Sequence, residues 1–509
     1  MRILYLKNYR KGPATNSSST HSVIFKNKDD MFKDMNVFEE NFYDRYTETL
    51  AVSKSAKIKY IAANIMYYKP LYDTMCLIYP EMEQYRELIK ETINDEEEKY
   101  PYSFGMYARG RLYFRDNLEA SIGYLRNIIE NDDIIIVGGS DEEEFVYDTI
   151  EDHKKIELPD YLAKFFGSVK NGNYWVGYKF GRKIRFSTNR DICVPEYPEL
   201  IDLSITDKCE HGCPFCYKDA SKSGEHANID YVKNLIRNVN AGYPISETHY
   251  KKKIEFAIGG GNILLYPNLG DLFDFITHEG HIVNVTLNAK DYPCLFDEKK
   301  NKGIKEIFDK YVTSVGVSVT SMEDVELLKK YGYWIPARYK NDYDSRPASV
   351  VIHLIPEMLG AEKTNEIINE LRDEKMELCF WNILCLGYKT NGRGGNYPYK
   401  ELTDKELNKI FQNRYSINID TTFANRYIDW LKDNYETENT LTLLEGEYSM
   451  YIDAVKMLAY KSSYMLDKPY NVAPYHADEF RDRKMKRLSI IEAFGRIRED
   501  NGLEVYKEW

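Results

Sequence analysis

The sequence predicts an α/β protein built on a partial (β/α)6 TIM-like barrel, with an α+β N-terminal domain and a mostly helical C-terminal extension. Two observations lead to this fold class. From about residue 201 short apolar runs alternate with amphipathic helical patterns, and the first 195 or so residues lack that rhythm. Strands that alternate with helices pair in parallel through right-handed crossovers, and six such units close only part of a barrel.

The repeat contains six apolar runs of strand length with helical patterns between them. A further strand candidate at 134–137 follows a helical pattern at 118–129, and a hairpin-like stretch covers 174–186. A late candidate at 447–453 could close the open side of the barrel and touch the substrate. The six runs of the repeat are 201–206, 254–258, 282–287, 314–319, 349–354 and 378–386.

Length and composition bound the organisation of the chain. Its 509 residues exceed one typical domain, and a hydrophobic content of 43% supports a large core. We expect an N-terminal α+β domain at 1–195 as a candidate recognition module, the partial barrel at 196–400, and a mostly helical region at 401–509.

Charge and hydropathy narrow the possible partners. No stretch approaches about twenty consecutive apolar residues, and the N-terminus has only a broken apolar run, so we expect a cytoplasmic protein without a membrane partner. The net charge of −12 argues against broad nucleic-acid binding, which needs Lys and Arg to displace counterions. The basic run at 481–487 is read as a solvated helix face, with a docking patch as the alternative.

Three of the eight cysteines follow directly on the first strand of the repeat. Cys209, Cys213 and Cys216 are separated by three and two residues. A disulfide scaffold would spread its cysteines over a much shorter chain, whereas a tight group of soft thiolates is typical of a metal or iron–sulfur site. Three thiolates fit three corners of a cubane and leave the fourth iron open to another ligand.

A zinc knuckle is the alternative for these cysteines. Zinc requires a fourth ligand, and the nearest candidate is His211. That histidine lies inside the cysteine loop, where it is poorly placed to complete a tetrahedron with its neighbours. The spacing therefore favours the cluster.

The preceding strand, the cysteine spacing, Phe215 before the last cysteine and Tyr217 after it together resemble the radical S-adenosylmethionine (SAM) superfamily. The resemblance spans about residues 196–400. It implies a [4Fe–4S] cluster on the three cysteines, with SAM as the second cofactor and an electron donor such as flavodoxin or ferredoxin. In that family one electron splits SAM into methionine and a 5′-deoxyadenosyl radical, which takes a hydrogen atom from the substrate.

The second strand ends in Gly259, Gly260, Gly261 and Asn262. Glycines let backbone groups approach a ligand closely. In the resembling enzymes this turn meets the amino group of SAM, usually through a glutamate where Asn262 stands here. The asparagine keeps a carbonyl acceptor and loses the charge.

The resemblance places further SAM contacts at the ends of later strands, on Asn288, Ser318, Pro356 and Lys389. Arg393 is a second candidate, beside Lys389, for pairing with a carboxylate. Ser, Thr and Asn at such positions also cap the following helix, and that alternative stays open for Asn288 and Ser318.

Cys385 is a candidate hydrogen-atom donor to a substrate radical. It shares one strand face with Cys379 and Trp381, and the role requires that face to line the barrel interior. A small buried structural cysteine is the alternative. No cysteine follows Cys385, so we expect no auxiliary clusters.

Three functions remain open at this level. The first is a radical SAM enzyme that abstracts a hydrogen atom from a peptide or protein. The second is radical SAM modification of a nucleotide or nucleic-acid base. The third is a non-catalytic metal-binding scaffold, which iron and sulfide content would separate from the two enzymes.

Overall fold

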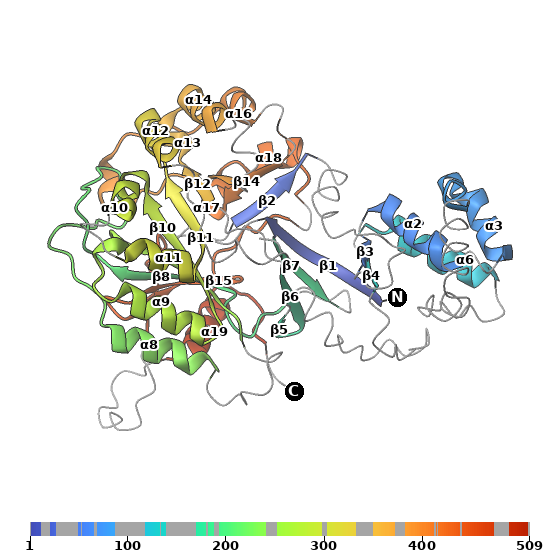
Figure 1. The fold of residues 1–509 in the computed structure, drawn as a ribbon, viewed down its shortest axis with the longest axis horizontal. Coiled ribbons are helices and arrows are strands. Elements are labelled where there is room, and N and C mark those ends of the chain that lie inside the picture. Colours follow the sequence, from blue (N-terminus) through green and yellow to red (C-terminus); the bar gives the residue numbers. More distant parts are fainter. Residues whose placement is uncertain are drawn as a thin grey trace. The chain divides into compact units, whose positions relative to one another are not determined.

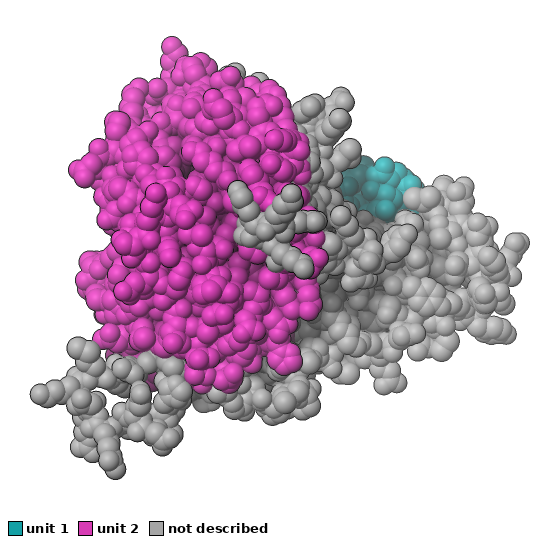
Figure 2. Space-filling view, turned by 60° about the vertical axis from the view of Figure 1, so that its left-hand side comes forward, with its two compact units in different colours: residues 1–7, 27–165, 186–192 teal, residues 8–26, 166–185, 193–509 magenta. Residues whose placement is uncertain are grey.

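The computed structural model divides into two compact units (Figure 2). Unit 1 holds residues 1–7, 27–165 and 186–192, and unit 2 holds residues 8–26, 166–185 and 193–509. The structure describes residues 2–11, 21–26, 49–51, 53–65, 69–86, 118–132, 134–138, 169–179, 182–187, 193–240, 252–297, 303–331, 350–371, 382–411, 414, 416–437, 440–472 and 488–506.

Unit 1 combines short antiparallel strands with helices. Strand β4 (Ile134–Gly138) pairs with β3 (Thr49–Ala51) and with the first residues of β1 (Arg2–Lys11). The helix and strand predicted at 118–129 and 134–137 are α6 (Leu118–Glu130) and β4. An apolar core joins α6 to α2 (Lys54–Ile65) and α3 (Lys69–Ile78).

Unit 2 is built on an eleven-stranded sheet in the order β17-β16-β15-β8-β9-β10-β11-β12-β13-β14-β2. The strands from β15 to β14 in that order all run parallel. The predicted α/β fold class with a parallel sheet is therefore confirmed. The parallel strands are β8 (Leu200–Thr206), β9 (Glu255–Gly260), β10 (Ile282–Asn288), β11 (Val312–Ser318), β12 (Val350–Leu354), β13 (Asn382–Cys385), β14 (Ser416–Asp420) and β15 (Ser449–Asp453).

The sheet extends beyond the six predicted strands. Strand β14 joins the parallel run after β13, and β15 pairs with β8, on the side where the 447–453 candidate was expected. Antiparallel strands flank the run: β2 (His21–Phe25) beside β14, and β16 (Leu458–Tyr460) then β17 (Tyr470–Asn471) beyond β15. The division into 1–195, 196–400 and 401–509 stays a prediction.

Helices cover one face of this sheet. Figure 1 shows α8 (Ile229–Arg237), α9 (Leu269–His278), α11 (Ile304–Tyr311), α10 (Tyr292–Phe296) and α12 (Met322–Lys330) following one another along the outside of the strands. Within the described ranges, no helix combines the length and apolar character needed to cross a membrane. The remaining helices of unit 2 are α13 (Pro356–Leu359), α14 (Ala361–Leu371), α16 (Asp404–Phe411), α17 (Thr421–Arg426), α18 (Ile428–Asn434) and α19 (Ile490–Asp500).

The two faces of the sheet differ in polarity because successive side chains of a strand point to opposite sides. In β8 the apolar side chains pack into the large core under the helices. The polar ones point to the opposite face, which we call the inner face. From β8 the apolar set is Ile201, Leu203 and Ile205, and the polar set is Asp202, Ser204 and Thr206.

The sheet curves around its inner face. The Nζ atom of Lys389, which follows β13, lies 3.8 Å from Oδ2 of Asp420 at the end of β14. The charge of Lys389 also acts on the Asp202 carboxyl of β8. These strands lie far apart in the sheet order, so only a curved sheet brings their side chains together.

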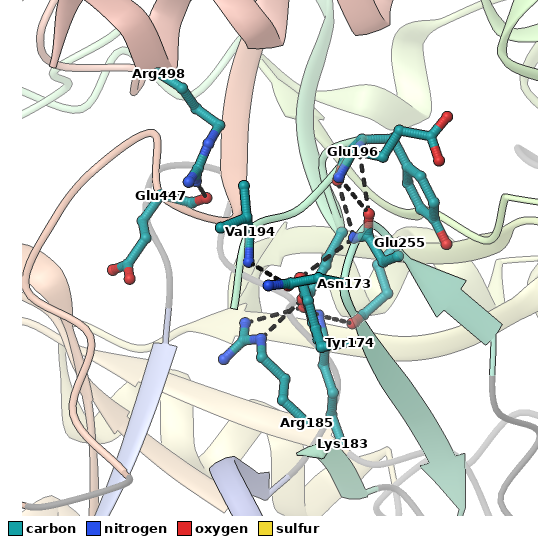
Figure 3. Close-up of polar contacts among 12 residues, drawn as sticks. Asn173, Tyr174, Lys183, Arg185, Val194, Glu196, Glu255, Glu447 and Arg498 are labelled. Carbon is teal, nitrogen blue, oxygen red and sulfur yellow. Dashed lines mark hydrogen bonds and ion pairs between the residues drawn. The ribbon is translucent and has the colours of Figure 1, made fainter. Parts of the chain in front are cut away.

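A buried ionic network lies at the start of β8 (Figure 3). Arg185, from β7 (Arg182–Ser187), binds both Glu199 carboxylate oxygens through Nε at 2.8 Å and Nη2 at 2.9 Å. Lys183 of the same strand contacts Glu199 and lies 3.4 Å from Glu255 of β9. Tyr174, from β6 (Tyr174–Lys179), donates its hydroxyl to Glu199. The predicted hairpin at 174–186 thereby anchors to the beginning of the sheet.

Candidate active site

The cysteine loop leaves the carboxyl end of β8. Cys209, Cys213 and Cys216 are free thiols, and all three are partly exposed. The backbone of the loop is ordered by hydrogen bonds from Cys209 N to Ser221 O (2.8 Å) and from Cys216 N to Cys213 O (3.2 Å). Burial raises the pKa of the Cys213 thiol, and the neighbouring Cys216 and Cys209 thiols raise it further.

The donor set fits an iron–sulfur cluster. Three soft thiols on one loop supply three of the four ligands of a cubane, and their partial exposure leaves access for a further ligand. In the part of the chain that the structure describes, no three His, Cys, Asp or Glu side chains form a group suited to a single metal ion. A cubane takes one thiolate per iron, so its ligands surround a larger body instead of converging on one point.

Arg393 holds the cysteine loop from the segment after β13. Its Nε atom donates to Cys213 O at 3.0 Å, and its backbone N donates to Cys216 O at 3.1 Å. The guanidinium also reaches Ala220 O at 2.9 Å and Asp219 Oδ1 at 2.7 Å. The sequence suggested Arg393 as a partner for a ligand carboxylate, whereas the described contacts are with the loop itself.

The glycine turn after β9 packs against the base of the same loop. Gly260 has a φ of +120°, and a Cβ atom there would lie 2.3 Å from Thr206 O. A Cβ on Gly261 would lie 2.2 Å from Lys208 O. The amide of Gly261 donates to Thr206 O at 2.6 Å, and that of Asn262 donates to Lys208 O at 2.8 Å. Both positions therefore require glycine for a close approach between two backbone segments.

Asp291 connects the cysteine loop to the ends of β9 and β10. Its Oδ1 atom lies 2.6 Å from His211 Nε2 and accepts from Asn262 Nδ2 at 3.0 Å. Its Oδ2 atom accepts from the backbone N of Asn288 at 3.0 Å. The hydrogen bond with Asp291 is the main cause of a raised His211 pKa. The network links side chains that lie up to 80 residues apart in the chain.

Asn262 and Asn288 both act as caps. Asn262 Oδ1 accepts from Leu264 N at 3.0 Å, and Asn288 Oδ1 accepts from Lys290 N at 3.0 Å. The capping alternative is therefore present at Asn288. An amide oxygen has two lone pairs, so one on each side chain remains for a ligand.

The other predicted SAM contacts lie at the ends of neighbouring strands. Ser318 closes β11 and is half-buried, and its register partner on β12 is His353. Pro356 is buried at the first position of α13. His353 is buried, and burial together with the charge of Lys389 lowers its pKa to about 3.

Lys389 lies beside the cysteine loop. Its Nζ atom is 5.1 Å from the centroid of the Tyr217 ring, one residue beyond Cys216, and 5.1 Å from that of Tyr464. Phe215, just before Cys216, packs edge-on against Tyr397 at 5.6 Å between ring centroids. Burial lowers the pKa of Lys389, while nearby carboxyls oppose that effect.

Lys389 forms an acid-rich cluster with Asp202, Asp420 and Glu445, which we call the inner cluster. Burial raises the pKa of Asp202, against the opposing charge of Lys389, and raises the pKa of Glu445 to about 8. The sequence reading missed all three acids. The signal for Asp202 was its place in a period-two polar series within a buried strand, together with Ser204 and Thr206.

A cavity of about 520 Å³ adjoins the inner cluster. Glu445 and Tyr464 contribute to its wall, so the cavity reaches the groups around Lys389. Its other lining residues are Thr422, Asn425, Arg426, Leu443, Leu444, Lys461, Met465 and Asn501.

Cys385 lies among the apolar side chains between the sheet and its helices. It is 2% exposed, and burial raises the pKa of its thiol to about 12. Its face is therefore the helix side of β13, which does not favour the hydrogen-donor role and leaves that role a prediction. Cys379, Trp381 and the basic run at 481–487 lie outside the described residues.

No protein-family model and no curated protein matches the chain. Among solved structures it is similar to Streptococcus suis SuiB bound to S-adenosylmethionine, with a TM-score of 0.36 and 11% identity over 75% of each chain. SuiB bound to the precursor peptide SuiA gives 0.36 and 12%, over 53% of this chain and 60% of that one. Native anSMEcpe with bound AdoMet and a peptide gives 0.32 and 15%, over 53% and 75%. Likeness at this level is distant, and the function is inferred from the site itself.

Proposed function

We propose that the chain is a radical SAM enzyme with a [4Fe–4S] cluster on Cys209, Cys213 and Cys216 and SAM at the open iron. The observation that carries this proposal is the placement of three free thiols on one loop at the carboxyl end of β8. In α/β folds of this kind, active sites form at the carboxyl ends of the parallel strands. When bound, the two cofactors supply one-electron cleavage of SAM and hydrogen-atom abstraction.

The protein's own groups hold and shape this site. Arg393 and Asp291 both hold the cysteine loop, and Gly260 and Gly261, which follow Gly259 of β9, bring the neighbouring turn against it. We assign the remaining lone pairs of Asn262 and Asn288 to SAM. Tyr217, Phe215, Ser318, Pro356 and Lys389 complete the proposed cofactor pocket, and an external donor such as flavodoxin or ferredoxin supplies the electron.

We further propose a peptide or protein substrate. The cavity beside Glu445 and Tyr464 has the volume to accept a side chain. The inner cluster places three carboxyls around Lys389, an arrangement that suits a phosphate group poorly. These features favour a peptide over a nucleotide or nucleic-acid base.

Metal and sulfide analysis tests the cofactor assignment. The chain is purified and reconstituted without oxygen, together with a Cys209, Cys213, Cys216→Ala variant and a Cys294→Ala control. We expect about four iron and four sulfide per chain in the wild type and the control, and almost none in the triple variant. One tightly bound zinc and no sulfide in the wild type would favour the scaffold instead.

A further inference from the structure

The inner cluster holds more acids than bases. Asp202, Asp420 and Glu445 act together on Lys389, and all four side chains are buried. Lys389 approaches Asp420 only to 3.8 Å. Buried carboxyls are costly to charge unless cations or hydrogen-bond donors meet them.

Several oxygens of this cluster have no hydrogen-bond partner among the described residues. Asp202 is 4% exposed and neither of its carboxyl oxygens has a partner within 3.5 Å, although the Ser463 hydroxyl lies near enough to lower the pKa of that carboxyl. Glu445 is 7% exposed; its Oε1 atom accepts from Tyr464 at 2.7 Å, and its Oε2 atom has no partner within 3.5 Å, although the Thr421 hydroxyl lies near enough to act on the pKa of the carboxyl. Buried polar atoms are almost always satisfied, so these oxygens indicate a place where a ligand donates hydrogen bonds.

Aromatic rings give the same place an affinity for positive charge. The rings of Tyr217 and Tyr464 flank the Lys389 ammonium on the inner face. The faces of aromatic rings attract cations, most strongly where water is excluded. Tyr464 also lines the cavity, so an entering cation would meet the same aromatic side chain.

The cavity leads from this cluster to exposed apolar side chains. Leu444 is 51% exposed and Met465 38%, and both belong to its lining. Of the two cations in the wall, Arg426 is already paired with Glu357. Lys461 remains as a feature that would favour an acidic ligand, and the experiment must separate that outcome.

We propose that this cavity is the substrate subsite and that it takes a cationic side chain, the ammonium of lysine or the guanidinium of arginine. The cation donates hydrogen bonds to Glu445, whose carboxyl is within electrostatic range of Asp202, and its aliphatic stem packs along Leu443, Leu444 and Met465. This inference rests on the proposed function, because it names the substrate class of the same enzyme.

Calorimetric titration of the full-length chain tests the subsite with three matched probes. They are N-acetyl-lysine N-methylamide, its neutral counterpart from norleucine, and its acidic counterpart from glutamate. We expect the lysine probe to bind at least about tenfold more tightly than either of the others. Equal binding of the norleucine probe, or tighter binding of the glutamate probe, would overturn the proposal.

Three variants test whether the preference for the lysine probe comes from the carboxyls of the inner cluster. Glu445→Gln and Asp202→Asn should each reduce affinity for the lysine probe by about tenfold or more. Asp467→Asn removes an exposed carboxyl of a nearby loop and should change nothing. With the pKa of Glu445 near 8, its carboxyl is mostly neutral at pH 7 in the free chain, so the glutamine variant should fold normally, and binding of the cation releases the carboxyl proton to solvent. Unchanged affinity in this variant would contradict the subsite.

The subsite and the enzyme proposal fail separately. Probe binding is measured without any cofactor, whereas the enzyme proposal depends on iron, sulfide and SAM cleavage. Loss of the cation preference with intact SAM cleavage removes only the subsite. Cation binding by a chain that never assembles a cluster keeps the subsite and removes the enzyme.

Discussion

The Nε2 atom of His211 lies 2.6 Å from Oδ1 of Asp291, and this contact ties the middle of the cysteine loop to the turn after β10. Asp291 is 4% exposed and also receives the side chain of Asn262. One buried carboxylate therefore sets the position of the loop relative to two neighbouring strand ends.

Replacing Asp291 with asparagine should loosen the proposed cluster site. The variant keeps the shape of the side chain and removes the charge that holds His211. We expect reconstituted iron per chain to fall and the electron paramagnetic resonance signal of the reduced cluster to broaden. The control is Asp271→Asn on α9, whose side chain is 72% exposed and pairs with Lys233 at 3.2 Å. Identical iron content and spectra in wild type and Asp291→Asn would contradict this role.

Alanine at Gly261 should destabilise unit 2. The added Cβ would meet the backbone of Lys208 at 2.2 Å, and overpacking of this kind costs about 1–3 kcal/mol. Gly123→Ala is the matched control, because that glycine lies in α6 with open space around it and alanine favours a helix by about 0.5–1 kcal/mol. Urea denaturation followed by circular dichroism measures both. A neutral Gly261→Ala would mean that the turn does not pack as described.

The Glu199 network should make the free energy of unfolding of unit 2 depend on pH in the acidic range. Burial alone would raise the pKa of Glu199, but Arg185 and Lys183 lower it to about 2. A lowered folded-state pKa gives stability that is present above the unfolded value of about 4.5 and is lost as the pH falls toward about 2. Glu199→Gln should cost about 3–5 kcal/mol at neutral pH and remove this acid dependence.

An exposed pair provides the comparison. Lys409 and Glu362 lie 2.7 Å apart with side chains that are 49% and 78% exposed. Water screens exposed pairs of this kind, so Glu362→Gln should leave the free energy of unfolding almost unchanged in the same denaturation series. Equal losses from Glu199→Gln and Glu362→Gln would refute a special role for the buried network.

The thiol of Cys385 should resist alkylation in the folded chain. Its pKa near 12 leaves almost no thiolate at pH 8, and the core surrounds it. Iodoacetamide labelling followed by peptide mass spectrometry should modify the partly exposed Cys294 first and Cys385 only after unfolding. Equal labelling rates for Cys294 and Cys385 in the folded chain would show that solvent reaches Cys385, and would support its predicted role as a hydrogen-atom donor.

Much of the sheet could be predicted from local patterns. The first five predicted runs agree with β8 to β12 to within a few residues. A buried strand is a short stretch of mostly apolar residues, and such a stretch can be recognised from the local sequence alone. The sixth predicted run, 378–386, contains β13 (Asn382–Cys385) in its carboxyl-terminal part. Strand β15 falls within the 447–453 run, which was predicted as a strand that could close the open side of the barrel. Strand β14 was not predicted, because it is short and lies in a region with many helical patterns.

The candidate site also contains residues that could be predicted from the sequence and residues that could not. Cys209, Cys213 and Cys216 stand out because their spacing is local. Asp291, Arg393 and the inner cluster depend on contacts between segments far apart in the chain, such as Arg393 with Cys213, 180 residues away. No spacing rule in one sequence predicts such contacts.

The most direct test of the account is SAM cleavage by the reconstituted chain. The protein is incubated with SAM and dithionite without oxygen, and 5′-deoxyadenosine is measured by mass spectrometry beside the Cys209, Cys213, Cys216→Ala variant. We expect 5′-deoxyadenosine from the wild type and none from the variant. An iron–sulfur protein that never cleaves SAM, even with cell extract as a source of substrate, would contradict it.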